Sequence, residues 1–186
     1  MAAERLIAAL TRRRASGEVV APDAAAEAVV GRLRAWGVER AVLADDPVLA
    51  KLRLPEALEE AGVEVLTWPT GRGPRELLGL EGPEATCGIS VPLAGVAERG
   101  TLMLEARAGQ GRALDAAAAY HVAVLPADRV RETLSEALAE AYRGRTIPSA
   151  LSLVSAPSRT SDIEKISTLG AHGALGLHAL VVEPAG

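Results

Sequence analysis

Two hydroxyls and a guanidinium follow one another at Ser158-Arg159-Thr160, directly after an apolar stretch and a turn at Pro157. Ser161 and Glu164 then have the S-x-x-E spacing of a capping box, which predicts that a helix begins there. Free amides at a helix start, two hydroxyls and a guanidinium together suit a phosphate or a carboxylate. The alternative is that the hydroxyls only cap the helix and that the arginine pairs with Asp162.

A second candidate group is the stretch AERGTLMLE, in which Glu98 stands just before a glycine turn that leads into a buried strand. Its carboxylate could act as a nucleophile or base if the turn directs it into a cleft. The alternative is a solvated carboxylate beside Arg99. Glu98 is therefore one candidate catalytic residue. The other is His172, which stands in a turn between Ala171 and Gly173, where the alternative is a polar surface group. The predicted ligand-binding set is Ser158, Arg159, Thr160, Ser161, Asp162, His172, Gly173, Gly100 and Thr101.

The remaining reactive side chains favour structural roles. Cys87 is the one cysteine of the chain, and it is expected to be a buried, inert thiol. His121 and His178 lie within apolar segments, which is typical of structural histidines. These residues lack the spacing of a metal site, so no metal is expected.

Composition narrows the class of protein. The chain has 186 residues, of which 49% are hydrophobic and 24% charged, as in one compact globular domain. Its net charge of −4 and its 2% aromatic content argue against nucleic acid as a partner. No run of 18 apolar residues occurs, so no membrane insertion is expected. The first residues place an acid before the arginines, unlike a signal peptide, and predict a cytoplasmic protein.

Short apolar runs alternate with helical patterns along the chain. Strands are predicted over residues 40–44, 63–68, 86–91, 101–105, 121–125, 151–155 and 177–183. Helices are predicted over residues 22–36, 47–58, 74–80, 93–98, 130–142 and 161–169, with an exposed loop over 106–113. This order predicts an α/β fold with a mostly parallel sheet flanked by helices. Residues 1–20 are expected to form an N-terminal amphipathic helix or arm, and residues 21–186 a single domain.

Two stretches resemble one known family. APSRTSDIEKISTLGAHG followed by LHALVVE is similar to the carboxyl-terminal signature of the lactate utilization protein C family, also called the LutC/YkgG or LUD-domain family. CGISVPLAGVAERGTLML is similar to the family's central motif. The likeness covers roughly residues 85–183.

The resemblance implies a fold like that of the NagB/RpiA/CoA-transferase superfamily. It also implies a subunit of a three-protein system that oxidises L-lactate to pyruvate, whose partner proteins carry iron–sulfur clusters. The expected role is accessory or regulatory, with an anion-binding pocket and no redox cofactor in this chain. The alternative is a stand-alone enzyme or binding protein for an acyl-CoA, sugar phosphate or nucleotide. A third hypothesis is an interaction module that uses the N-terminal helix.

Overall fold

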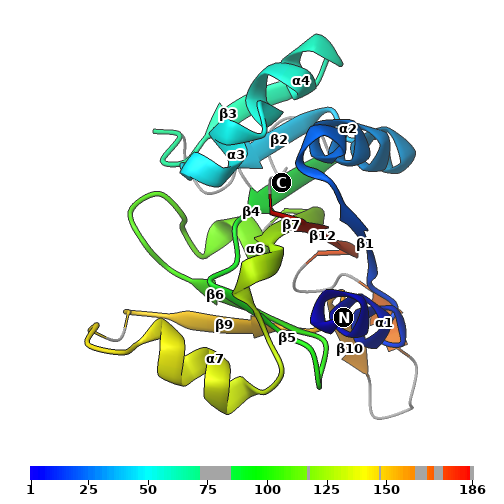
Figure 1. The fold of residues 1–186 in the computed structure, drawn as a ribbon. Coiled ribbons are helices and arrows are strands. Elements are labelled where there is room, and N and C mark those ends of the chain that lie inside the picture. Colours follow the sequence, from blue (N-terminus) through cyan, green and yellow to red (C-terminus); the bar gives the residue numbers. More distant parts are fainter. Residues whose placement is uncertain (72–84, 117, 147, 162–166, 170–173, 185–186) are drawn as a thin grey trace.

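A six-stranded sheet, parallel throughout, forms the centre of the computed structural model, in the order β1-β12-β7-β4-β2-β3 (Figure 1). The structure describes residues 1–71, 85–116, 118–146, 148–161, 167–169 and 174–184. The strands are β1 (Ser16–Val20), β2 (Arg40–Leu43), β3 (Glu64–Thr67), β4 (Thr86–Ser90), β7 (Tyr120–Pro126) and β12 (Gly176–Val182). The predicted α/β fold with a mostly parallel sheet is confirmed.

Alternating side chains of the central strands bury both faces of this sheet. On β7, Val122 and Val124 belong to the core on one face, whereas Ala123 and Leu125 belong to the core on the other. A strand buried on both faces reads as a continuous apolar run, which is why the HVAVL stretch predicts it.

Three helices cover the first face: α2 (Ala25–Trp36), α3 (Pro47–Lys51) and α4 (Leu54–Glu60). The short 3-10 helix η1 (Pro22–Ala24) precedes α2. Val29 and Leu33 are fully buried on the inner side of α2, and Gly37 ends the helix in the left-handed region with φ of 66°. The two helical segments predicted over 22–36 and 47–58 are thus present, the second divided at Arg53.

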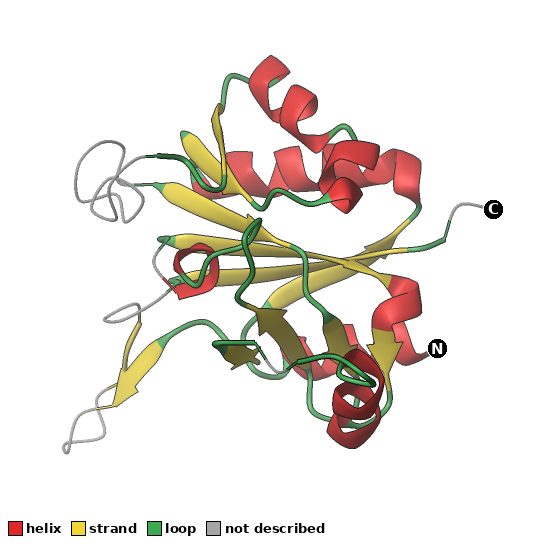
Figure 2. Ribbon diagram, turned by 90° about the vertical axis from the view of Figure 1, so that its left-hand side faces the viewer, coloured by secondary structure: helices red, strands yellow, loops and turns green. Residues whose placement is uncertain are grey.

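The opposite face is covered by α1 (Ala2–Thr11) and by a second sheet in the order β8-β5-β6-β9, and α7 (Leu134–Ala141) packs on this second sheet (Figure 2). Its strands are β8 (Val130–Arg131), β5 (Ala94–Val96), β6 (Thr101–Glu105) and β9 (Leu151–Val154). The other short helices are α6 (Ala113–Ala116) and η2 (Ala127–Arg129). Leu6 and Leu10 of α1 pack against Leu125 and Val181 in this layer's core.

The N-terminal arm contains more than a helix. The expected amphipathic helix is present as α1, but residues 16–20 form β1, which pairs in parallel with β12 at the edge of the central sheet. Helix α1 packs against β1, the outermost strand on that side of the central sheet (Figure 1). The division of the chain after residue 20 stays a prediction.

Three predicted helical segments are wrong in whole or in part. Residues 159–161 and 167–169 are not helical but form an antiparallel pair, β10 (Arg159–Ser161) and β11 (Ser167–Leu169). Residues 93–98 contain β5 instead of a helical turn. Residues 130–142 begin as strand β8, and α7 starts only at Leu134. The segment 74–80 lies outside the described residues.

Two causes explain these errors, one local and one tertiary. The stretch from residue 159 to 169 holds two threonines and two isoleucines, whose branched side chains favour strands over helices, so the capping-box spacing was the weaker signal. In β5, a Cβ on Gly95 would lie 2.6 Å from side-chain carbons of Leu6 and Leu125. Strand β5 therefore packs so closely beneath the main sheet that the backbone itself fills the space.

Candidate functional site

The order in which the chain adds strands to the central sheet reverses between β2 and β4. The chain passes outward from β2 to β3, returns to β4, and continues to β7 and β12 on the other side. Open parallel sheets bind ligands beyond the carboxyl ends of their strands at such a reversal. Asp46, Val91 and Arg129 follow β2, β4 and β7, which are neighbours in the sheet. These three residues therefore meet at one edge of the sheet.

Asp46 links β2 to the helix that follows it. Its Oδ1 accepts a hydrogen bond from the Val48 N–H at 2.8 Å, as an N-cap residue does, and Pro47 occupies the first helical position. Its Oδ2 forms an ion pair with Arg107 Nη2. The Asp46 side chain is only 6% exposed, so both carboxylate oxygens are engaged inside the protein.

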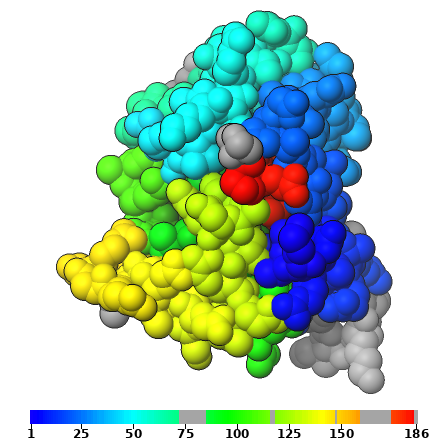
Figure 3. Space-filling view, in the orientation of Figure 1, coloured from blue at the N-terminus to red at the C-terminus, as the bar shows by residue number. Residues whose placement is uncertain are grey.

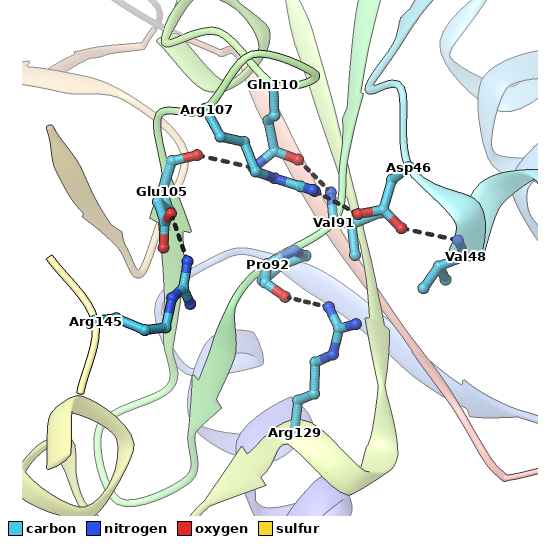
Figure 4. Close-up of polar contacts among 9 residues, drawn as sticks. All are labelled: Asp46, Val48, Val91, Pro92, Glu105, Arg107, Gln110, Arg129 and Arg145. Atoms are coloured by element: carbon cyan, nitrogen blue, oxygen red, sulfur yellow. Dashed lines mark hydrogen bonds and ion pairs between the residues drawn. The ribbon is translucent and has the colours of Figure 1, made fainter. Parts of the chain in front are cut away.

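The loop after β6 is held over this edge by hydrogen bonds to the residues that follow β2 and β4, and Figure 4 shows the one between Gln110 and Val91. The Asp45 N–H donates to the Gly109 carbonyl at 2.8 Å, and the Val91 N–H donates to Gln110 Oε1 at 2.8 Å. Arg107 and Gln110 exchange two backbone hydrogen bonds of 2.9 and 3.0 Å, which closes the loop on itself. Gln110 is 3% exposed, so the prediction of an exposed loop over 106–113 is wrong at its centre.

Glu105, at the end of β6, faces the same edge. Its Oε1 accepts from Arg145 Nη2 at 3.1 Å, while Arg145 Nη1 donates to the Ala141 carbonyl at the end of α7. The Glu105 side chain is 11% exposed, and its Oε2 has no hydrogen-bond partner among the described residues. Glu105 thus holds Arg145 at the edge while keeping one carboxylate oxygen uncommitted.

Arg129 is the least committed cation of the group. Its Nη1 donates to the Pro92 carbonyl at 3.4 Å, a long contact, and in the described part of the chain no carboxylate lies within ion-pair distance of it. Most donors of this half-buried guanidinium therefore remain available to a ligand.

Together these groups line a cleft of about 310 Å³, here called the arginine cleft. In Figure 3 the cyan surface of α3 and the yellow surface of α7 lie on opposite sides of the green segments between them. Three guanidiniums face two carboxylates, and both carboxylates already have arginine partners. The arrangement suits an anion, which Arg129 could bind through two parallel hydrogen bonds. The lining residues are Asp46, Val91, Leu93, Glu105, Arg107, Gln110, Arg129 and Arg145.

The residues singled out in the sequence lie elsewhere. Ser158 donates its backbone N–H to the Ala174 carbonyl at 2.8 Å, and Leu175 donates to Ala119, so this segment lies near the amino ends of β12 and β7. Arg159, Thr160 and Ser161 form β10. Asp162, His172 and Gly173 lie outside the described residues. The predicted pocket at these residues stays a prediction: residues 159–161 are extended, and the first turn of the predicted helix, residues 162–166, lies outside the described residues.

Glu98, Gly100 and Thr101 lie at the start of β6, the end opposite to Glu105. Four residues of strand span about 13 Å at roughly 3.3 Å per residue. Thr101 Oγ1 lies 2.8 Å from Ser155 Oγ, which brings β6 and the end of β9 together. Gly100 has φ of 62°, and a Cβ there would lie 2.7 Å from the backbone of Ala9 and Leu10. This glycine therefore permits close contact with α1.

The carboxylate of Glu98 has structural partners. Its Oε1 accepts from the Leu134 N–H at 3.3 Å, at the first turn of α7, and lies 3.9 Å from Arg99 Nε. An acid at that position complements the helix dipole. Glu98 also lines a separate space of about 300 Å³ together with Arg12, Arg13 and Arg99, so its catalytic role stays a prediction.

The buried nucleophile and the two buried histidines behave as structural groups. Cys87 is fully buried, and burial raises the pKa of its thiol. His121 Nε2 lies 2.7 Å from Ser90 Oγ, and burial lowers the pKa of this imidazole to about 4. His178 Nδ1 lies 2.9 Å from Ser16 Oγ; burial, with a smaller effect of Arg32, lowers its pKa to about 4.

Sequence reasoning missed the arginine cleft because its charged residues come from four separate segments of the chain. One signal was available: an acid and a proline, Asp46-Pro47, directly after a predicted buried strand, which is where parallel sheets place ligands. The arginines at 107, 129 and 145 stand in unrelated local patterns, so nothing in the sequence marks them as a group.

Within the described segments, no group of three or more His, Cys, Asp or Glu side chains could hold a metal ion. No helix in those segments combines the length and apolar character needed to cross a membrane.

Comparisons with known proteins agree with the fold. A family model described as the LUD domain matches residues 3–182. The uncharacterized protein YkgG of Escherichia coli is 27% identical over 170 residues, covering 89% of this chain and 72% of the relative. Lactate utilization protein C of Halalkalibacterium halodurans is 28% identical over 165 residues, covering 87% and 70%. The crystal structure of a DUF162 family protein from Deinococcus radiodurans superposes with a TM-score of 0.67 at 23% identity, covering 97% and 96%.

Proposed function

Since the chain belongs to the LUD domain family, and several relatives bear the name lactate utilization protein C, we propose that it serves in lactate utilization. The match extends from residue 3 to residue 182, so the likeness includes the segments that form the arginine cleft.

Within that process the proposed role is a subunit that binds an anion, as one of three cooperating proteins that oxidise L-lactate to pyruvate. Its partners would carry the iron–sulfur clusters, and this chain would act as an accessory or regulatory subunit without a redox cofactor of its own. One cysteine cannot supply the four thiolates of a common cluster, which supports this division of labour.

The single observation that carries the anion-binding role is the uncommitted guanidinium of Arg129 at the carboxyl edge of the sheet. Arg145 lies beside it on the same cleft, and Arg107 is fixed by Asp46. A planar carboxylate matches the fork of a guanidinium, and both lactate and pyruvate carry one. Phosphate has matching geometry, so a sugar phosphate or nucleotide, or an acyl-CoA, is the alternative ligand.

A binding experiment tests this role and locates the site. Thermal unfolding is followed with increasing L-lactate, pyruvate, inorganic phosphate and AMP for the wild-type chain and for Arg129→Ala, Arg159→Ala and Arg143→Ala. A ligand at one hundred times its dissociation constant adds about 2.7 kcal/mol to the unfolding free energy. We expect Arg129→Ala to abolish this gain, while Arg143→Ala, an exposed arginine near the cleft, retains it.

Loss of the gain in Arg159→Ala alone would place the ligand at the segment 158–161 instead, as the sequence predicts. The pathway itself is tested by deleting the gene and measuring growth and oxygen uptake on L-lactate. Normal lactate oxidation in the deletion strain would refute the proposed role.

A further inference from the structure

A second cavity of about 250 Å³ adjoins the arginine cleft. Leu93, Arg129 and Arg145 line both spaces, so these three side chains form the boundary between them. A ligand group bound by Arg129 therefore lies at the entrance to two spaces rather than at the bottom of one.

The lining of the second cavity differs from that of the arginine cleft. Apart from the shared residues, its uncharged lining is Ala94 of β5 together with Ala137 and Ala141 on one side of α7. Small side chains on a helix and on the strand beneath it leave an apolar trough between the two elements. Ala94 and Ala137 are buried, and both belong to the small core between α7 and this strand.

The other charged groups of this trough are already satisfied. Arg131 donates to both carboxylate oxygens of Glu140, and this hydrogen bonding raises the pKa of Arg131. The Arg131–Glu140 pair therefore closes one side of the trough without offering a free charge. The charge available to a ligand is concentrated at the boundary, on Arg129; beyond it the lining consists of the three alanines and this internally satisfied ion pair.

From this division we infer that the ligand of the arginine cleft is an amphiphilic anion: a carboxylate or phosphate head group joined to an aliphatic segment that lies in the trough along α7. The inference rests on the proposed anion-binding function and specifies its ligand class. Two adjoining spaces of about 310 and 250 Å³ are within the range of sites for ligands much larger than a three-carbon acid.

A chain-length series tests the inference. Dissociation constants are measured by isothermal titration calorimetry for L-lactate, butyrate, hexanoate and octanoate, and for the matching alkyl phosphates. Full burial of a methylene contributes about 0.8 kcal/mol, so affinity is expected to rise by up to about fourfold per added methylene until the trough is filled. The two series separate a carboxylate from a phosphate head group.

Two leucine substitutions on α7 locate the aliphatic segment. Ala141→Leu projects into the trough, whereas Ala139→Leu lies on the exposed side of the same helix and outside the cavity. We expect Ala141→Leu to keep binding of the shortest anion that binds the wild type and to lose the gain with chain length. Ala139→Leu is expected to keep both.

Three outcomes would overturn the inference. Arg129-dependent binding that is independent of chain length in the wild type overturns the amphiphilic ligand and leaves the proposed function intact. A full chain-length gain in Ala141→Leu shows that the aliphatic segment lies elsewhere. Absence of binding for every anion overturns the arginine cleft and this inference with it. The wild-type series needs no variant, so misfolding of a substituted protein does not prevent the test.

Discussion

Gln110 joins the loop after β6 to the end of β4, because its Oε1 accepts a hydrogen bond of 2.8 Å from the Val91 N–H. Val91 is buried and follows the last residue of β4, so its amide has no access to water. The Gln110 side chain thus provides an acceptor for the buried Val91 N–H at the point where the strand order of the sheet reverses.

We predict that Gln110→Met lowers the unfolding free energy by about 1–3 kcal/mol, since it leaves the buried Val91 N–H without an acceptor. Urea denaturation followed by circular dichroism measures the change. Arg112→Met, an exposed position on the same loop, is the matched control and should change stability by less than about 0.5 kcal/mol. Equal effects of the two substitutions would show that the bond does not hold the loop.

Gly100 and Gly37 provide a second test, because both have positive φ, of 62° and 66°, but different surroundings. A Cβ on Gly100 would lie 2.7 Å from the backbone of Ala9 and Leu10, whereas nothing lies within 4 Å of a Cβ on Gly37. Gly37→Ala should therefore cost about 1–2 kcal/mol from the left-handed conformation alone. Gly100→Ala should cost a further 1–3 kcal/mol or so, because α1 must shift.

Urea midpoints of the two alanine variants, compared with the wild type, measure this difference. A similar loss of unfolding free energy in both variants would mean that α1 can move away from a Cβ at position 100 without an energetic cost. It would also mean that the turn before β6 does not fix the position of α1.

Arg14 occupies a left-handed conformation that glycine adopts more easily. Its φ is 66°, and the turn is closed by Arg14 N–H to Thr11 carbonyl and Ala15 N–H to Leu10 carbonyl hydrogen bonds of 3.0 and 3.2 Å. We predict that Arg14→Gly raises the unfolding free energy, by up to about 1 kcal/mol. Arg12→Gly, two residues earlier with φ of −59°, should lower it by up to about 1 kcal/mol. Thermal denaturation measures the change in unfolding free energy of each variant. Changes of the same sign in both variants would contradict this explanation.

The sequence was sufficient for five of the six strands of the central sheet, whereas β1, within the segment expected to be a helix or arm, was not predicted. A strand such as β7 is buried on both faces, so every position must be apolar, and the pattern does not depend on its partners. Helix α2 was equally evident, since a proline precedes it, a glycine follows it, and apolar residues recur on one side between them.

The second layer was harder to predict because its elements depend on tertiary contacts. Strand β5 has only three residues, and its place follows from contact with Leu6 and Leu125, which are distant in sequence. The arginine cleft depends on the same kind of information. Arg129 and Arg145 meet only because η2 and the end of α7 lie at the edge reached by β6. No local sequence pattern indicates that these two arginines lie near each other.

The final prediction concerns pH. His121 is 1% exposed, and burial holds its pKa at about 4, whereas a histidine in the unfolded chain titrates near 6.5. Between these values the unfolded chain binds a proton that the folded chain does not. The unfolding free energy therefore rises with pH across this window. The contribution of His121 is fully present above about pH 6.5 and is lost as the pH falls toward 4.

The expected loss from His121 is on the order of 3 kcal/mol over that window. Carboxylates also titrate there, so the comparison is with His121→Gln, whose amide can still bond Ser90 Oγ but does not bind a proton in this range. Urea midpoints are measured at half-unit steps from pH 7 to pH 4. From pH 7 to pH 4 the wild type should lose about 3 kcal/mol more unfolding free energy than the variant, whatever their difference at pH 7. Parallel curves would show that His121 is protonated within the folded protein.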